Sequence, residues 1–389
     1  MKHSLIFTVF SLLFLRSDEA GITSVLSEEG DLALEMQLKM LNKPYIKSFK
    51  DEYGVVFDCV DMYRQPALDH PLLKNHTLQI APTSLKSTRT HPSTSGEPSV
   101  RFGLRESCPD GTVPIRRTLK QDLARTSVPL SRFRPDTESS RVPGQHFAQL
   151  LIDSEAGSNF QAAGAVIEVD VVAVPRGQLS SAQMILIDDS SSRASVIQTG
   201  WMVAPDRFGD SQTRFVTHWT MMTKGLDHPM AQADDYKTTG CMNVLCPGFV
   251  VLSQTATPGM VLSNSFVTVG ISVSKDAETG NWQVFLNQQI VGYFPKEIIN
   301  GMSGAAEVQM GGITYAPPGQ KSPRMGTGVA PVAGKATLAS SFTQARVQGA
   351  NIAKQWVTKD VSDPAIYNIE MTSDSSEESA FQYGGPGGV

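Results

Sequence analysis

The sequence IQTGW at residues 197–201 is followed by RFGD at 207–210, TRFVTHWT at 213–220 and GCMNVLCPGFV at 240–250. These short apolar and aromatic runs are broken by Pro205, the Gly209-Asp210 pair and Gly248, which end strands and set turns. Outside this stretch, the runs at 147–152, 165–174, 182–187 and 265–274 also have the β-branched content and length of strands. Short strands at this spacing predict an antiparallel β-sandwich over residues 144–389.

Length and composition limit the classes of protein that this chain can belong to. A chain of 389 residues is too long for one ordinary small domain and predicts two folded units. Only 18% of the residues are charged, and Gly and Pro are plentiful, which favours strands and turns over helix bundles. The net charge is -5, and no basic stripe is found, so a nucleic-acid partner is not expected.

The N-terminal segment has the composition of a secretion signal. Lys2 precedes an apolar run at residues 5–15, which is too short to span a bilayer but suits the hydrophobic region of a signal peptide. We therefore expect residues 1–20 to be a signal peptide, the protein to be secreted, and no membrane segment to remain after cleavage. A short buried N-terminal helix is the alternative.

Four cysteines are compatible with an oxidising, extracellular compartment. Three pairings are possible, and the simplest joins Cys241 to Cys246 and leaves Cys59 to pair with Cys108. A zinc site is disfavoured, because C-x4-C has no second Cys/His pair at ligand spacing. We expect no metal and no cofactor. Asn75 begins the sequon Asn-His-Thr and is the predicted glycosylation site.

Taken together, the motifs at 197–250 resemble the plant neprosin family, which consists of secreted glutamic peptidases that cut after proline. QPALDHPLLKNH at 65–76 and SCPDGTVPIRR at 107–117 resemble the activation-peptide module that precedes the peptidase domain. The resemblance implies a small α+β activation-type module at 21–123. Within it, the apolar residues of 32–50 predict a helix, and the Ser-, Thr- and Pro-rich composition of 81–100 predicts a flexible loop. A Ser-, Arg- and Pro-containing linker at 124–143 would then lead to the sandwich at 144–389. Asp61, Asp69 and His70 are expected to cap turns rather than to form a catalytic cluster.

The expected catalytic residues differ from the family pattern. Peptide hydrolysis by paired carboxyl groups needs one group that activates water and one that protonates or polarises the peptide. The resemblance places the two glutamates at Gln198, just before Gly-Trp, and at Ile313, after Gly-Gly. Gln309 stands at a position that is sometimes acidic. Glu307 should share a strand face with Ile313, but it lies about 20 Å further along the strand and cannot substitute in place.

Three functions remain open on these residues. The first is a proline-directed glutamic endopeptidase fold with weak or no activity, because Gln cannot act as a general base. The second is an active peptidase with a rearranged carboxyl site, and the third is a non-catalytic binder of proline-rich or cell-wall proteins. Trp201 and Trp219 are predicted to be core residues or walls of the cleft. The expected partners are a proline-containing peptide or protein in the apoplast and the chain's own activation module.

Overall fold

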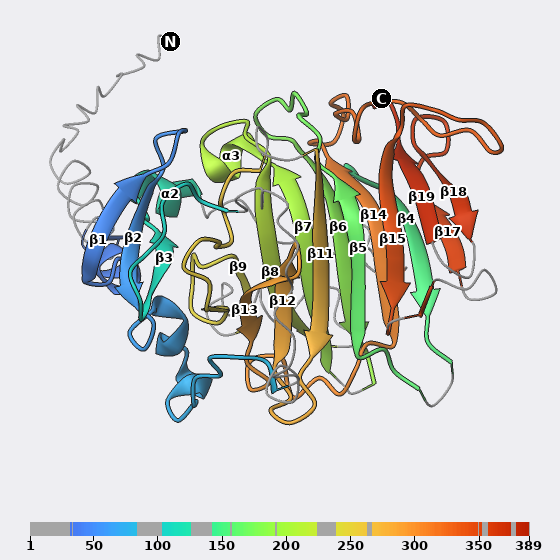
Figure 1. Cartoon of the computed structure of the whole chain (residues 1–389). Coiled ribbons are helices and arrows are strands. Elements are labelled where there is room, and N and C mark those ends of the chain that lie inside the picture. The colour runs from blue at the N-terminus through green and yellow to red at the C-terminus, as the bar shows by residue number, and fades with distance from the viewer. Residues whose placement is uncertain are drawn as a thin grey trace, which may run out of the picture.

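The computed structural model of the chain describes residues 32, 34–83, 103–125, 142–155, 158–190, 193–223, 239–262, 267–348, 350–351, 357–374 and 379–388. Over these residues the fold is mainly β, with antiparallel sheets, as the sequence predicts (Figure 1). The predicted signal peptide lies outside the described residues, as do most of the predicted loop at 81–100 and most of the predicted linker at 124–143. No helix within the described ranges is long and apolar enough to cross a membrane.

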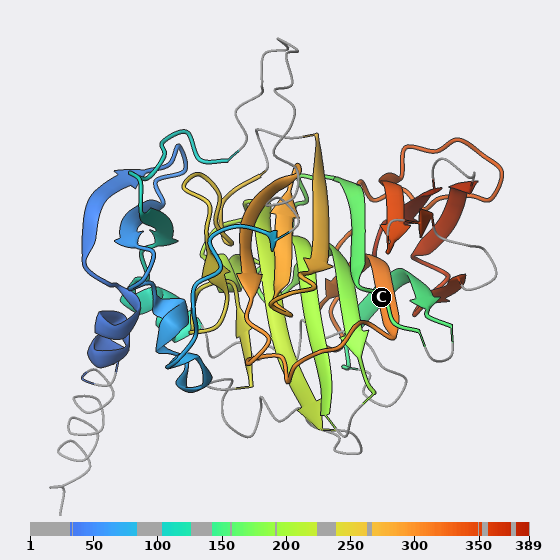
Figure 2. The same cartoon turned by 60° about the horizontal axis from the view of Figure 1, so that its bottom comes forward.

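The N-terminal part folds as a small module around a three-stranded antiparallel sheet in the order β1-β2-β3. Its strands are β1 (Tyr45–Lys50), β2 (Val56–Asp61) and β3 (Thr112–Arg116). A helix at 34–41 precedes them. The 3-10 turns η1 (Pro66–Asp69) and η2 (Pro71–Leu73) and the helix α2 (Lys120–Arg125) complete the module. This α+β module occupies one end of the molecule in both views (Figures 1 and 2).

The predicted helix at 32–50 is wrong in its second half. The helix ends at Leu41, and Tyr45–Lys50 forms β1, which pairs with β2. Pro44 disfavours helical geometry at the residue before it, which ends the helix before Tyr45. The buried Phe49 packs on Phe57 of β2.

Two large sheets form the sandwich. The seven-stranded sheet has the order β17-β4-β14-β6-β7-β8-β9. Its strands are β4 (Gln145–Asp153), β6 (Leu179–Asp188), β7 (Arg193–Val203), β8 (Arg214–Thr223), β9 (Gly240–Met242), β14 (Glu307–Tyr315) and β17 (Val357–Val361). A short helix, α3 (Pro205–Phe208), joins β7 to β8.

The nine-stranded sheet has the order β10-β13-β12-β11-β5-β15-β19-β18, with β16 paired to β15. Its strands are β5 (Ala162–Glu168), β10 (Val250–Val251), β11 (Thr268–Lys275), β12 (Trp282–Leu286), β13 (Gln289–Phe294), β15 (Ser340–Val347), β16 (Ala350–Asn351), β18 (Asn368–Asp374) and β19 (Ser379–Gly384). Apolar side chains from both sheets, such as Leu186, Trp201 and Ile271, share one buried core. The same core continues into the module through Phe57 and Val113.

Both disulfides match the predicted pairing. Cys59 on β2 is bonded to Cys108, which closes the module across 49 residues of sequence. Cys241 on β9 is bonded to Cys246 and closes a short loop beside β8.

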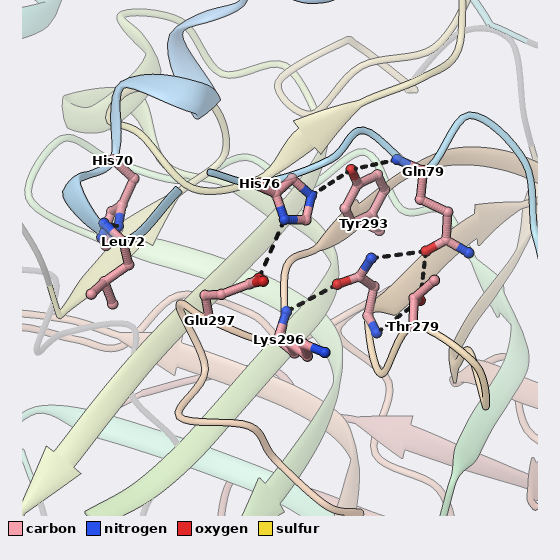
Figure 3. A network of polar contacts seen from close by, with 9 residues as sticks. His70, Leu72, His76, Gln79, Thr279, Tyr293, Lys296 and Glu297 are labelled. Carbon is pink, nitrogen blue, oxygen red and sulfur yellow. Dashed lines mark hydrogen bonds and ion pairs between the residues drawn. The ribbon is translucent and has the colours of Figure 1, made fainter. Parts of the chain in front are cut away.

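The module docks on the sandwich through a polar network near β13 (Figure 3). Tyr293 on β13 shares its hydroxyl with His76 Nε2 at 2.9 Å and accepts the backbone N–H of Gln79 at 3.0 Å. Gln79 Nε2 donates to the carboxylate of Asp276 at 2.8 Å. Further towards the N-terminus, Gln65 binds both backbone polar groups of Val251 on the edge strand β10, at 2.8 and 3.0 Å. These bonds satisfy a sheet edge that would otherwise be open to pairing.

Candidate functional site

The candidate site lies on the face of the seven-stranded sheet that points away from the nine-stranded sheet, which we call the outer face. Strand residues alternate between faces, and Ile197 and Trp201 point into the core, so Gln198 points outward. The strand register places Gln198 in one row with His218 on β8, Ile185 on β6 and Gln309 on β14. All four side chains are buried.

The register separates Gln198 from Ile313. Ile313 also lies on the outer face, but it opposes Ser181 of β6, whereas Gln198 opposes Ile185. Two strand spacings and four residues along the strand put their Cα atoms about 16 Å apart. The residue of β14 in the row of Gln198 is Gln309. Ile313 instead packs in an apolar cluster with Phe147 and Ile185.

Gln198 is paired with an imidazole. His218 Nδ1 lies 2.6 Å from Gln198 Oε1, and because this oxygen can only accept, Nδ1 carries the proton. Burial, and then the positive charge of Arg207, lower the pKa of His218 to about 3. The ring is therefore neutral at ordinary pH, and its Nε2 is a buried acceptor without a hydrogen-bond partner in the described part of the chain. His218 was not singled out from the sequence, although it alternates in phase with Val216 and Thr220 on β8.

Two further glutamines occupy the next row of the outer face. Gln183 on β6 stands opposite Gly200 on β7 and Gly311 on β14. On the other side of β14, Gly311 stands opposite Gln149 on β4. A Cβ atom at Gly200 or Gly311 would lie 2.0 or 2.2 Å from a carbonyl oxygen of the neighbouring strand. Only glycine fits there, so Gln183 has no side chain beside it on either neighbouring strand. Gln149 Nε2 and Gln309 Oε1 are buried and have no partner among the described residues.

The carboxyl group of Glu307 is hydrogen-bonded to this set, and Asp360 on β17 stands opposite Gln149 in the register. Gln309 Nε2 donates to Glu307 Oε1 at 2.6 Å, so both side chains lie on the outer face. Burial raises the pKa of Glu307, and the nearby carboxylates Asp153, Asp189 and Asp360 act in the same direction. The register places its Cα about 12 Å from that of Gln198.

The two tryptophans lie on the opposite side of the sheet from Gln198. Trp201 and Trp219 are fully buried between the sheets. Trp201 Nε1 donates to the carbonyl of Glu168 at 2.8 Å, and Trp219 meets the ring of His70 edge-on at 5.7 Å. They are core residues, the first of the two roles that the sequence left open.

Other predicted features lie away from the outer face. His70 Nδ1 accepts the backbone N–H of Leu72, and Asp61 accepts that of Tyr63, so both cap turns as expected. Asn75 is exposed. A groove of about 620 Å³ runs over the nine-stranded sheet across β5, β11 and β15. It is lined by small or amide residues such as Gly164, Ser272 and Asn287, and no carboxyl group lines it.

Chemically, the row of Gln198 offers amide groups and one neutral imidazole. Such groups donate and accept hydrogen bonds with a peptide backbone and can polarise a carbonyl. They do not supply a proton donor and a proton acceptor with separated pKa values.

Comparison with known proteins gives a family and several distant folds. The family model described as Neprosin matches residues 176–386, more than half of the chain, and the model described as Neprosin activation peptide matches residues 48–159. Scytalido-glutamic peptidase with a peptide-based transition state analog is similar at 15% identity, over 62% of this chain and 98% of that chain, with a TM-score of 0.33. SCP-B, a member of the Eqolisin family of peptidases in a complex with the tripeptide Ala-Ile-His, is similar at 14% identity over 62% and 98%, with a TM-score of 0.31. A β-porphyranase from the human gut bacterium Bacteroides plebeius is similar at 6% identity over 44% and 65%, with a TM-score of 0.23.

Proposed function

Because the chain belongs to the neprosin family, we propose that it is a secreted member with weak or no peptidase activity, which binds proline-containing peptides through the outer face. The activation-type module stays part of this proposal as the chain's own partner, since it is docked on the sandwich through Gln65, His76 and Gln79. Proline preference follows from the family resemblance.

The observation that carries the proposal is the composition of the row of Gln198. Along the described strands this row reads Met242, His218, Gln198, Ile185, Gln309, Leu151 and Thr358, without a carboxyl group. A glutamine amide takes no proton at useful pH, and the imidazole with a pKa of about 3 is a weak base. Hydrolysis of a peptide at this row would therefore lack both its acid and its base.

The proposal is tested by incubating the protein with a fluorogenic proline-containing peptide across pH 2 to 7, before and after acid incubation. We expect no cleavage above the rate of a heat-unfolded control. Two double variants are assayed alongside it: Gln198→Glu with Ile313→Glu, and Gln198→Glu with Gln309→Glu. The second places both new carboxyl groups in one row, so we expect any gain of activity there. Cleavage by the natural chain at a rate equal to or above that of the double variants would overturn the proposal.

A second function is favoured by one observation, the raised pKa of Glu307 beside Gln309. A carboxyl group that holds its proton longer than usual can act as a general acid, with a water placed between it and Gln198. If the natural chain cleaves the peptide, Glu307→Gln should abolish the activity, whereas Asp189→Asn should preserve it. Activity that survives Glu307→Gln would exclude this rearranged site.

A further inference from the structure

Arg207 is a buried cation that the proposed function does not use. It lies on α3, directly after β7, and only 4% of its surface is exposed. Its Nε and Nη1 atoms have no hydrogen-bond partner among the residues that the structure describes. Burial, and then the charge of Arg116, lower its pKa to about 10, so the guanidinium is still charged at physiological pH.

The module brings one acidic and one basic side chain to Arg207 among the described residues. Arg116 and Asp122 both act electrostatically on Arg207, and α2, which carries Asp122, contacts α3. Asp122 already accepts from Arg116 at 3.4 Å and from the backbone N–H of Leu119 at 2.8 Å. Among the described residues, two guanidinium groups therefore lie near one carboxylate. A buried charge whose donors lack partners is costly, and such groups are often found at binding and catalytic sites.

The helix α3, which carries Arg207, packs on the outer face. Phe208 shares a buried apolar cluster with Met202 on β7 and Val216 on β8, and Val216 lies two residues from His218 on the same face. The charge of Arg207 also lowers the pKa of His218, the partner of Gln198. Because the row of Gln198 carries no charged side chain along the described strands, Arg207 would supply the charge selectivity of this end of the outer face.

Arg214 is the internal comparison, since it is a buried arginine with partners. It is fully buried, its Nη1 donates to the carbonyl of Gly259 at 2.7 Å, and its Nη2 donates to Asp210 at 2.5 Å. Its guanidinium is thus paired with a carboxylate within the fold, although its Nε has no hydrogen-bond partner among the described residues. The two buried arginines differ in degree, because Arg207 leaves both Nε and Nη1 without a partner there.

We propose that Arg207 recognises a carboxylate of the peptide bound at the outer face, either an Asp or Glu side chain or the free C-terminus of the peptide. This proposal rests on the proposed function, and it narrows the ligand to acidic or carboxyl-terminal proline-containing peptides. Guanidinium groups bind carboxylates by strong charge-assisted hydrogen bonds, and more so when water is excluded. Because α2 packs against α3, the proposal requires α2 to move aside before a peptide carboxylate can reach Arg207.

The first arm of the test measures peptide binding by calorimetry on the full chain, with a protease recognition sequence inserted at 126–141, both uncut and cut. The probes are three proline-containing hexapeptides: one with Glu and an amidated end, one with Gln and an amidated end, and one with Gln and a free C-terminus. We expect the cut chain to bind one of the two carboxylate peptides at least tenfold more tightly than the amidated Gln peptide. Arg207→Met should remove this preference, Arg207→Lys should keep part of it, and the exposed control Arg176→Met should leave it unchanged.

The second arm needs no ligand and separates recognition from a structural role. Arg207→Met removes an unpaired buried charge and should leave the melting temperature of the unliganded chain unchanged or raised, whereas Arg214→Met should lower it. A lowered melting temperature for Arg207→Met would assign Arg207 to the fold and overturn the inference.

Equal binding of the three peptides, or binding of none, would also overturn the carboxylate site. Failure of the carboxylate site can be told apart from failure of the proposed loss of peptidase activity. Cleavage of the peptides contradicts the proposed loss of activity but leaves the preference for a carboxylate measurable. Uncleaved peptides bound without preference contradict only the role of Arg207.

Discussion

The two faces of the seven-stranded sheet differ in the polar groups that they bury. The inner face carries Leu150, Trp201 and other apolar side chains, which fill the core shared with the nine-stranded sheet. On the outer face, the neighbouring positions carry Gln149, Gln198 and His218. The alternation of strand residues produces both faces from the same segments.

The polar atoms of the outer face show what this difference means. Buried amides normally find partners, because an unmet donor or acceptor keeps its full desolvation cost. Gln149 Nε2, Gln309 Oε1 and His218 Nε2 lack partners among the described residues. The inner face has one such atom on β8, Trp219 Nε1, whereas the outer face has these three, which under the proposed function are the groups that meet a ligand.

The largest expected loss of stability comes from a substitution on the inner face. Trp201→Ala removes a fully buried indole and its hydrogen bond to the carbonyl of Glu168. We expect the free energy of unfolding to fall by about 3–5 kcal/mol, measured by denaturant titration. A loss below about 1 kcal/mol would mean that the two sheets do not share a tightly packed core.

A matched pair of adjacent residues compares the faces directly. Leu150→Gln places an unpartnered amide in the core and should cost at least about 1–3 kcal/mol, in addition to the lost apolar contacts. Gln149→Leu removes an unpartnered amide and should change the free energy of unfolding by no more than about 1 kcal/mol. Equal destabilisation by both substitutions, under the same denaturant titration, would refute the contrast between the faces.

The smallest expected effect is the pH dependence of stability, because two groups oppose each other. The pKa of His218 falls from 6.5 to about 3 on folding, so only the unfolded chain takes up this proton between these values. His218 therefore makes the folded state less stable as the pH falls through that window. Burial raises the pKa of Asp170 from 3.8 to about 6, so the folded chain keeps this proton, and stability falls as the pH rises from 3.8 to 6.

Variants at the two positions should separate these contributions. His218→Gln should make stability less sensitive to acid between pH 6.5 and 3, and Asp170→Asn should reduce the loss between pH 3.8 and 6. The free energy of unfolding measured at several pH values checks both slopes. A variant whose pH profile runs parallel to that of the natural chain would show that its residue does not titrate differently in the folded state.

The sequence predicts local features well, because they depend on neighbouring residues. Alternation predicts β-structure around Trp201, and loop length predicts the pairing of Cys241 with Cys246, which the structure confirms. The prediction of a helix over 32–50 is wrong after Leu41, because Pro44 ends the helix and the following residues pair with β2.

The candidate site was harder to predict, since it depends on strand order. Periodicity along β14 correctly places Glu307, Gln309 and Ile313 on one face. It cannot show that β6 lies between β14 and β7, nor that Gln309 is therefore the residue of β14 in the row of Gln198. The sequence does not predict the buried position of Arg207 for the same reason, because Arg116 and Asp122 of the module come near it only in the folded chain.

The central claim is that the outer face binds a peptide without cutting it. One measurement tests this most directly: calorimetric titration of the linker-cut protein with a proline-containing hexapeptide, followed by mass spectrometry of the peptide recovered from the cell. We predict saturable binding and a recovered peptide of unchanged mass. Recovery of cleaved fragments, or the absence of any binding, would contradict the account.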